Sequence, residues 1–137
     1  MIELEETLTK ITNIIDGYEG LNEDFSSPYF IQTMRDKLSA YAVHLGTFEA
    51  GFRKDNNSTE YTYKINKLTK RLEFRRGGMS IVDSEAEAEI SAKGYYMEFL
   101  DAEEAYFKIR NIREQVNKVL DSMSSKLRIL MSADGPT

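Results

Sequence analysis

A double glycine near the middle of the chain constrains the fold more than any other feature. Gly77 and Gly78 lie between a basic segment and an acidic one, in the stretch KINKLTKRLEFRRGGMSIVDSEAEAE at 64–89. Glycine readily adopts the left-handed conformation that ends many helices, and basic side chains in a last turn complement the negative end of the helix dipole. Ser84 and Glu87, three residues apart, form a capping-box pattern that predicts the start of the next helix. The stretch therefore predicts the turn of a long helical hairpin.

The segment before this turn carries a regular apolar seam. Ser27 is expected to cap its helix, and Pro28 to be the first helical residue, where the missing N–H has no cost. The apolar residues that follow alternate steps of three and four: Ile31, Met34, Leu38, Tyr41, Leu45, Phe48 and Phe52. Because this is the a/d pattern of a coiled coil, the helix is expected to pack along a partner helix.

The seam is broken at 54–59, where the sequence KDNNST contains poor or neutral helix formers. It resumes one residue out of phase, with Tyr61, Ile65, Leu68 and Leu72. Two alternatives follow: a short loop interrupts the helix at about 55–58, near Asn56-Asn57, or the helix continues with a local distortion. In both cases the first arm of the hairpin is predicted over 28–76.

Two further helices are predicted from the same kind of spacing. The helix over 1–18 has a stripe at steps of four and three that contains Leu4, Leu8, Ile11, Ile15 and Tyr18. The second arm is predicted over 84–131, a stretch without proline and with Gly94 as its only glycine. We therefore predict an all-α fold with a single helical domain over 1–137. It consists of a long antiparallel, coiled-coil-like hairpin with a shorter N-terminal helix beside its open end.

A surplus of large apolar side chains near the start of the second arm predicts contacts with another chain. A two-helix arm cannot cover wide apolar faces by itself, and large exposed apolar patches usually mark interfaces. The predicted oligomer or partner interface consists of Tyr95, Tyr96, Phe99, Leu100 and Phe107. We therefore expect the protein to form a homo-oligomer.

The composition excludes several classes of protein. Cysteine is absent, which excludes disulfides, thiol catalysis and thiolate metal sites. The start of the chain, MIELEETLTKIT, is acidic and amphipathic, unlike a signal peptide. No apolar run approaches the roughly 20 residues of a membrane-spanning helix. The expected location is the cytoplasm, that of the host cell if a phage encodes the protein, and no membrane partner is expected.

Residues that could carry catalysis are few. His44 is the only histidine, and no carboxylate lies at a convincing helical spacing from it, so we interpret it as an ordinary helix histidine. Glu103 and Glu104 could chelate a hard cation, but they more simply solvate a helix face. The sequence contains no phosphate-binding loop, dinucleotide fingerprint or nucleophile elbow. We predict no enzymatic activity, no cofactor and no metal site.

Positive charge is concentrated in the middle third of the chain, although the net charge is −5. The candidate nucleic-acid-binding residues are Lys64, Lys67, Lys70, Arg71, Arg75 and Arg76, interleaved with Tyr61 and Tyr63. Cations that contact phosphates, beside rings that stack on bases, suit single-stranded DNA. The alternative is that Glu85, Glu87 and Glu89, just after the turn, form ion pairs with these cations inside the chain. The net acidic charge of the protein favours this alternative.

The layout also resembles a known family. A short N-terminal segment and a basic helical arm precede a long final helix, which opens with Lys93-Gly94-Tyr95-Tyr96 and continues with Phe99-Leu100. Over roughly residues 30 to 130 this arrangement resembles the recombination-mediator (UvsY-like) family of T-even-type phages. The resemblance implies a small α-helical protein that forms ring-like oligomers, binds single-stranded DNA and loads a RecA-like recombinase.

Two functions from different classes are therefore predicted. The first is a non-enzymatic accessory protein of phage-type DNA metabolism, mediator-like, that contacts single-stranded DNA and a recombinase partner. The second is a structural, assembly or adaptor protein, such as a virion or scaffold component, that acts only through helical protein–protein contacts.

Overall fold

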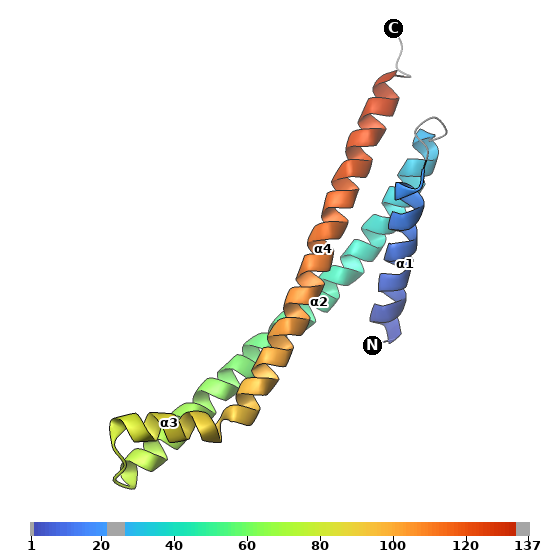
Figure 1. Ribbon diagram of the computed structural model, residues 1–137. Coiled ribbons are helices and arrows are strands. Elements are labelled where there is room, and N and C mark those ends of the chain that lie inside the picture. The colour runs from blue at the N-terminus through green and yellow to red at the C-terminus, as the bar shows by residue number, and fades with distance from the viewer. Residues whose placement is uncertain (1, 22–26, 134–137) are drawn as a thin grey trace. The chain divides into compact units, whose positions relative to one another are not determined.

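The fold is all-α, as predicted. The computed structural model describes residues 2–21 and 27–133, and within these ranges it contains helices and no strand (Figure 1). The helices are α1 (Ile2–Glu19), α2 (Pro28–Arg76), α3 (Ile81–Ser91) and α4 (Lys93–Ala133). Met1, at the start of the expected first helix, lies outside the described residues. The chain divides into two compact units: unit 1 consists of Met1–Phe48 and Ile109–Thr137, and unit 2 of Glu49–Lys108.

Unit 1 packs three helical segments around an apolar core: α1, the first part of α2 and the last part of α4. The latter two run in opposite directions, as expected for a hairpin (Figure 1). A hydrogen bond of 2.9 Å joins the hydroxyls of Tyr18 and Ser122 across α1 and α4. The buried apolar residues are Ile11, Ile31, Met34, Leu38, Leu45, Ile109, Val116, Met123 and Leu127. The a/d seam predicted for this part of the first arm therefore supplies much of the core.

The start of α2 has the predicted cap. The hydroxyl of Ser27 accepts a hydrogen bond of 3.2 Å from the backbone N–H of Phe30, and Pro28 is the first helical residue. The cap satisfies a backbone donor that has no partner inside the helix, and proline lacks a donor altogether. Both predictions for this helix start are confirmed.

The structure decides between the two alternatives for 54–59, because α2 is helical throughout. Inside this segment the hydroxyl of Thr59 donates to the carbonyl of Asp55 over 2.8 Å. In an uninterrupted helix, a change of phase by one residue turns an apolar row by about 100° around the axis. The later part of the predicted seam is accordingly exposed, and its expected burial along the second arm was wrong. Its exposed fractions are 67% for Tyr61, 43% for Ile65, 41% for Leu68 and 45% for Leu72.

Unit 2 is held together by aromatic contacts and small side chains. The ring of Tyr63 in α2 lies 5.1 Å from the ring of Tyr96 and 6.4 Å from that of Phe99, both in α4. The buried residues of this fully described unit are Ser84, Ala88 and Ala92. Unit 2 therefore buries no large apolar side chain, which leaves its larger apolar residues partly or fully accessible.

The end of α2 has the predicted glycine cap. Gly78 has a φ of 93°, in the region that favours glycine. Its N–H donates to the carbonyl of Arg75, and the N–H of Met79 donates to that of Phe74, each over 3.1 Å. These two bonds are the Schellman pattern, which satisfies carbonyls left free at the helix end.

The predicted start of the second arm at Ser84 was wrong. The N-cap is Ser80, whose hydroxyl accepts the N–H of Asp83 over 3.1 Å. Ser84 is buried inside α3, and its hydroxyl donates to the carbonyl of Ile81 over 2.9 Å. Ser80 followed three residues later by Asp83 is itself a capping pattern, so the sequence contained the correct signal.

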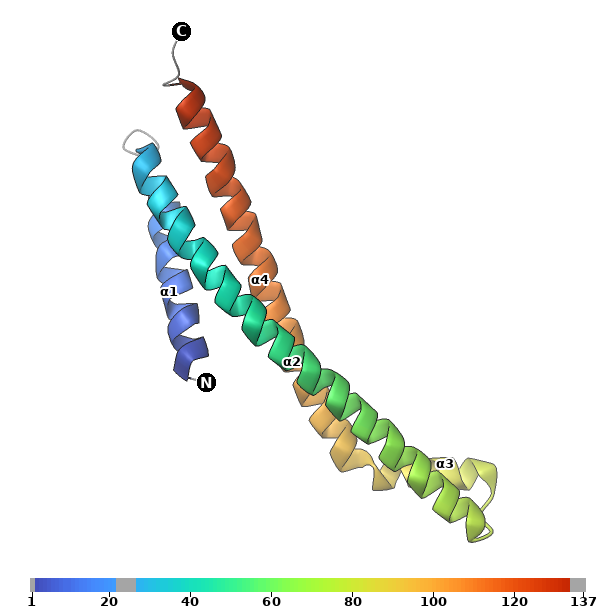
Figure 2. The same cartoon turned by 180° about the vertical axis from the view of Figure 1, so that it is seen from behind.

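The second arm is also not one helix, because it breaks at Ala92 between α3 and α4. Ala92 has a ψ of 4°, far from the value of about −42° of an α-helix. Helical hydrogen bonds flank the break: Ala92 donates to Ala88 over 2.9 Å, and Tyr96 donates to Ala92 over 3.0 Å. The two helices therefore take different directions, and within unit 2 both views show α3 beside the last part of α2 (Figure 1 and Figure 2).

Candidate interaction surface

Two of the six basic candidates form ion pairs with α3. The Lys67 ammonium donates to the Glu89 carboxylate over 3.1 Å, and the Arg71 guanidinium lies 3.7 Å from that of Glu85. The hydrogen bond from Lys67 to Glu89 raises the pKa of the lysine above its ordinary value, although partial burial acts in the opposite direction. The alternative in which acidic residues after the turn pair with the basic arm is therefore realised for these two cations.

The other basic candidates do not reach α3. Lys64 pairs with Glu60 over 2.6 Å, and Lys70 pairs with Glu73 over 3.2 Å, both along α2 itself. The guanidinium of Arg75 donates to the carbonyl of Met79 over 3.0 Å, at the end of the helix. Within unit 2, no ion pair includes Arg76. The basic cluster is thus divided among several environments rather than gathered into one anion-binding face.

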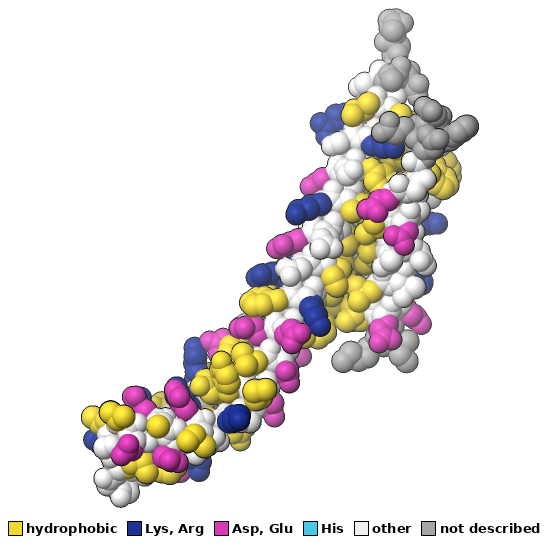
Figure 3. Space-filling model, viewed as in Figure 1, with side chains coloured by type: hydrophobic (Ala, Val, Ile, Leu, Met, Phe, Trp, Pro, Cys, Tyr) yellow, Lys and Arg dark blue, Asp and Glu magenta, His cyan; other side chains and the backbone are white. Residues whose placement is uncertain are grey.

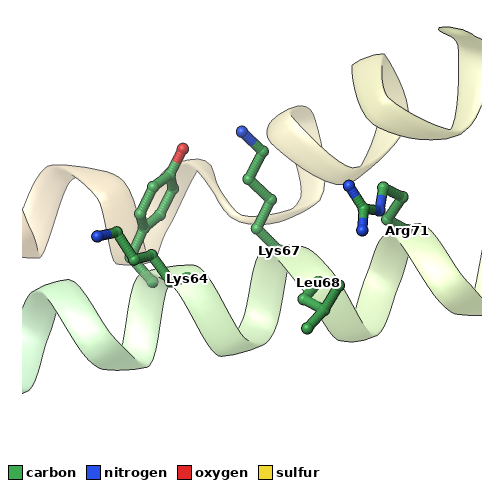
Figure 4. Close-up of a pocket in the computed structure, with 5 residues that line it drawn as sticks. Lys64, Lys67, Leu68 and Arg71 are labelled. Atoms are coloured by element: carbon green, nitrogen blue, oxygen red, sulfur yellow. The ribbon is translucent and has the colours of Figure 1, made fainter.

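The two aromatic candidates point to opposite sides of α2. Tyr63 contacts the rings of α4, so its face is already occupied, whereas Tyr61 is 67% exposed. Figure 4 shows Lys67 and Arg71 extending from α2 toward the neighbouring ribbon and Leu68 pointing away from it. A shallow hollow on α2 is lined by Tyr63, Lys64, Lys67, Leu68 and Arg71.

The predicted interface on α4 is also divided. Tyr96 and Phe99 contact Tyr63 within unit 2, and Leu100 is half-buried. Tyr95 and Phe107 are 40% and 39% exposed. Tyr96 and Phe99 therefore contribute to the packing of unit 2 itself. Self-association through the predicted interface stays a prediction.

Sequence reasoning missed an exposed apolar surface of unit 2. We name Tyr61, Ile65, Leu68 and Leu72 the outer stripe of α2, since these residues recur at steps of four, three and four and are all exposed. The change of phase after 54–59 was the signal for it, because it turns the row away from the earlier seam. Exposed apolar residues also occur on α3, where Ile81, Val82 and Ile90 are 61%, 76% and 67% exposed beside acidic side chains (Figure 3).

The chain was compared with protein-family models, curated proteins and solved structures. None of them matches it. The resemblance to the recombination-mediator family stays a prediction, and functional argument for this chain rests on the geometry of its own residues. Two findings concern the described residues alone: no helix among them is long and apolar enough to cross a membrane, and they contain no group of three metal-ligating side chains.

Proposed function

We propose that the chain is a non-enzymatic adaptor or assembly protein that acts through helix-to-helix contacts with other proteins. The outer stripe is the observation that carries the proposal. It has the heptad spacing with which one helix packs against another, and each of its four residues is at least 41% exposed. A contiguous apolar row on a protein surface marks an interaction site more often than isolated apolar residues do.

The charged residues of unit 2 support the same proposal. Lys67 and Arg71 pair with α3, and Lys64 and Lys70 pair within α2. An anion would have to compete with these carboxylates for four of the six basic candidates. A duplex or single strand of nucleic acid gains its affinity from unengaged cations that replace its counterions. A protein partner instead uses the apolar row, whose four residues stay at least 41% exposed.

A second candidate function is the mediator-like one, in which unit 2 contacts single-stranded DNA and a RecA-like recombinase. The hollow on α2 favours it, because the hollow combines the ring of Tyr63 with the cations of Lys64, Lys67 and Arg71. Exposed surface ion pairs contribute little energy, so phosphates could displace the carboxylates. In this function the outer stripe has no evident role.

One experiment compares the two functions directly. The purified protein is titrated with a fluorescent oligo(dT) and, separately, with a three-heptad amphipathic helical peptide that has leucine at a and d and glutamine at e and g. The proposed function predicts that the peptide binds, that Leu68→Ser removes this binding, and that oligo(dT) does not bind at about 50 mM salt. Salt-sensitive oligo(dT) binding without peptide binding would establish the second candidate instead. Replacing Lys67, Lys70, Arg71 and Arg75 with alanine should then abolish the binding.

A further inference from the structure

The outer stripe lies beside a row of basic side chains. Lys64 precedes Ile65 by one residue and Arg71 precedes Leu72 by one residue, which places both cations at g positions when the stripe occupies a and d. Arg75 follows Leu72 by three residues and continues the stripe itself at the next d position. We name Lys64, Arg71 and Arg75 the basic edge.

The opposite side of the stripe carries no compensating acid. Its e positions are Thr62, Thr69 and Arg76, that is, two uncharged residues and a third arginine. The nearest carboxylates of α2, those of Glu60 and Glu73, are already paired with Lys64 and Lys70. The apolar row therefore has cations along its g side and no anion along its e side.

This charge pattern opposes the pairing of two copies through the outer stripe. In a parallel pair, g residues of one helix face e residues of the other, so Arg71 of one copy would meet Arg76 of the second. In an antiparallel pair the two basic edges would face each other directly. Like charges across such a seam weaken the pairing and act against the wrong partner.

On these grounds we propose that the outer stripe binds an amphipathic helix of another protein whose apolar seam is flanked by aspartate or glutamate. This inference rests on the proposed function and specifies the chemistry of its partner. The stripe extends from Tyr61 to Leu72, which corresponds to about three helical turns. A partner helix of that length buries its own seam on the stripe, and its carboxylates face the basic edge.

The existing ion pairs of the basic edge are compatible with such a partner. Lys64 is 67% exposed in its side chain and its pair with Glu60 lies along the helix surface, and Arg71 is 42% exposed at 3.7 Å from Glu85. Exposed pairs of this kind exchange readily, because they gain little free energy over hydration. When the apolar contact holds a partner helix on the outer stripe, the carboxylates of that helix lie beside Lys64 and Arg71 and can pair with them.

The test uses three peptides that share one leucine seam over three heptads and differ only in the residues flanking it, which are glutamate, glutamine or lysine. Binding to the full-length protein is measured by fluorescence anisotropy at about 50 mM salt and again at about 500 mM salt. We expect the glutamate peptide to bind about tenfold more tightly than the glutamine peptide at low salt, and the lysine peptide to bind most weakly. At high salt the three affinities should converge.

Variants of the protein identify the surface. Lys64→Glu combined with Arg75→Glu should reverse the order of the glutamate and lysine peptides, and Ile65→Ser combined with Leu68→Ser should abolish binding of all three. Lys70→Glu is the control for charge reversal on the other side of α2: it reverses one cation, as each of the two substitutions does, and should leave the order unchanged. Circular dichroism of each variant verifies that the helices are intact.

The outcomes separate this inference from the proposed function. Equal binding of the three peptides that still depends on Leu68 would overturn the acidic partner and leave the adaptor function standing. No binding by any peptide would overturn both. Dimerisation of the protein that Leu68→Ser abolishes would show that a second copy occupies the stripe, which also overturns the inference. Oligo(dT) binding that Lys64→Glu removes, without peptide binding, would replace it with a nucleic-acid site.

Discussion

Lys67 of α2 and Glu89 of α3 form a hydrogen-bonded ion pair of 3.1 Å within unit 2. Together with the pair between Arg71 and Glu85, it joins α3 to α2 at two points that lie about one turn apart on each helix. The pairing matters for function because it occupies cations that the sequence alone offers to nucleic acid. It also explains why an acidic helix follows directly on a basic one.

The Lys67–Glu89 pair should stabilise the fold in a pH-dependent way. The hydrogen bond to Glu89 raises the pKa of Lys67 in the folded chain above its ordinary value of 10.5. The stabilisation is therefore complete below that pH and is lost as the pH rises through the folded pKa. In a double-mutant cycle with Lys67→Gln and Glu89→Gln, urea unfolding should give a coupling of about 0.5 kcal/mol from pH 7 to 9. The coupling should fall as the pH rises through the folded pKa of Lys67, and one that stays constant across the alkaline range would contradict this assignment.

Gly78 should tolerate substitution far less well than its neighbour Gly77. Because Gly78 has a φ of 93°, Gly78→Ala should cost about 1–2 kcal/mol of unfolding free energy. Gly77→Ala is the matched control: its new Cβ would lie 3.5 Å from the carbonyl oxygen of Phe74, an ordinary contact, so the change should stay within about 0.5 kcal/mol. Thermal or urea unfolding of both variants measures the difference. Equal costs would mean that the strain at Gly78 is not what ends α2.

Local signals predicted most of the fold correctly. Ser27 and Pro28 at the start of α2 and Gly78 at its end act through their own backbone groups, so a single sequence shows them. The break at Ala92 has no such local signal in the sequence. Ala88 and Ala92 look like ordinary helix formers in the sequence, and only the tertiary arrangement shows that they are buried. The cap at Ser80 could be recognised in the sequence, but the prediction placed the helix start at Ser84, four residues too late.

The candidate surface was harder to predict, because it depends on whether α2 is continuous. With a loop near Asn56 and Asn57, Leu68 could have rotated back into the hairpin seam. A continuous helix leaves no such freedom, and Tyr63 faces α4 instead. The basic residues are close together in the sequence, but helical spacing cannot reveal which carboxylate of another helix each of them meets. Arg71 reaches Glu85, whereas Arg75 turns to a backbone carbonyl.

The small buried residues of α3 should be sensitive to added volume. Ala88 is fully buried, so Ala88→Leu should overpack unit 2 and destabilise it by about 1–3 kcal/mol. Ala86→Leu adds the same atoms at an exposed position of the same helix and should change stability by no more than about 0.5 kcal/mol. Hydrogen exchange localises the effect, since amides of α3 should lose protection in the first variant and keep it in the second. Similar behaviour of the two variants would mean that α3 does not pack through Ala88.

A pair of identical substitutions in α2 tests the exposure of the outer stripe. Leu38 is fully buried in unit 1, and Leu38→Ala should therefore cost about 2–5 kcal/mol, from lost burial and the cavity left behind. Leu68 is 41% exposed, and Leu68→Ala should cost no more than about 1 kcal/mol. Urea unfolding at two protein concentrations measures both changes.

A large cost for Leu68→Ala would contradict the exposed position of the stripe in the isolated chain. If that cost rose with protein concentration, the stripe would be covered by a second copy, since stability gained by association depends on concentration. If it did not, the residue would be buried inside unit 2, and the one-residue change of phase would have been absorbed by a distortion of α2. The small, concentration-independent cost that we expect leaves the stripe free for a partner helix.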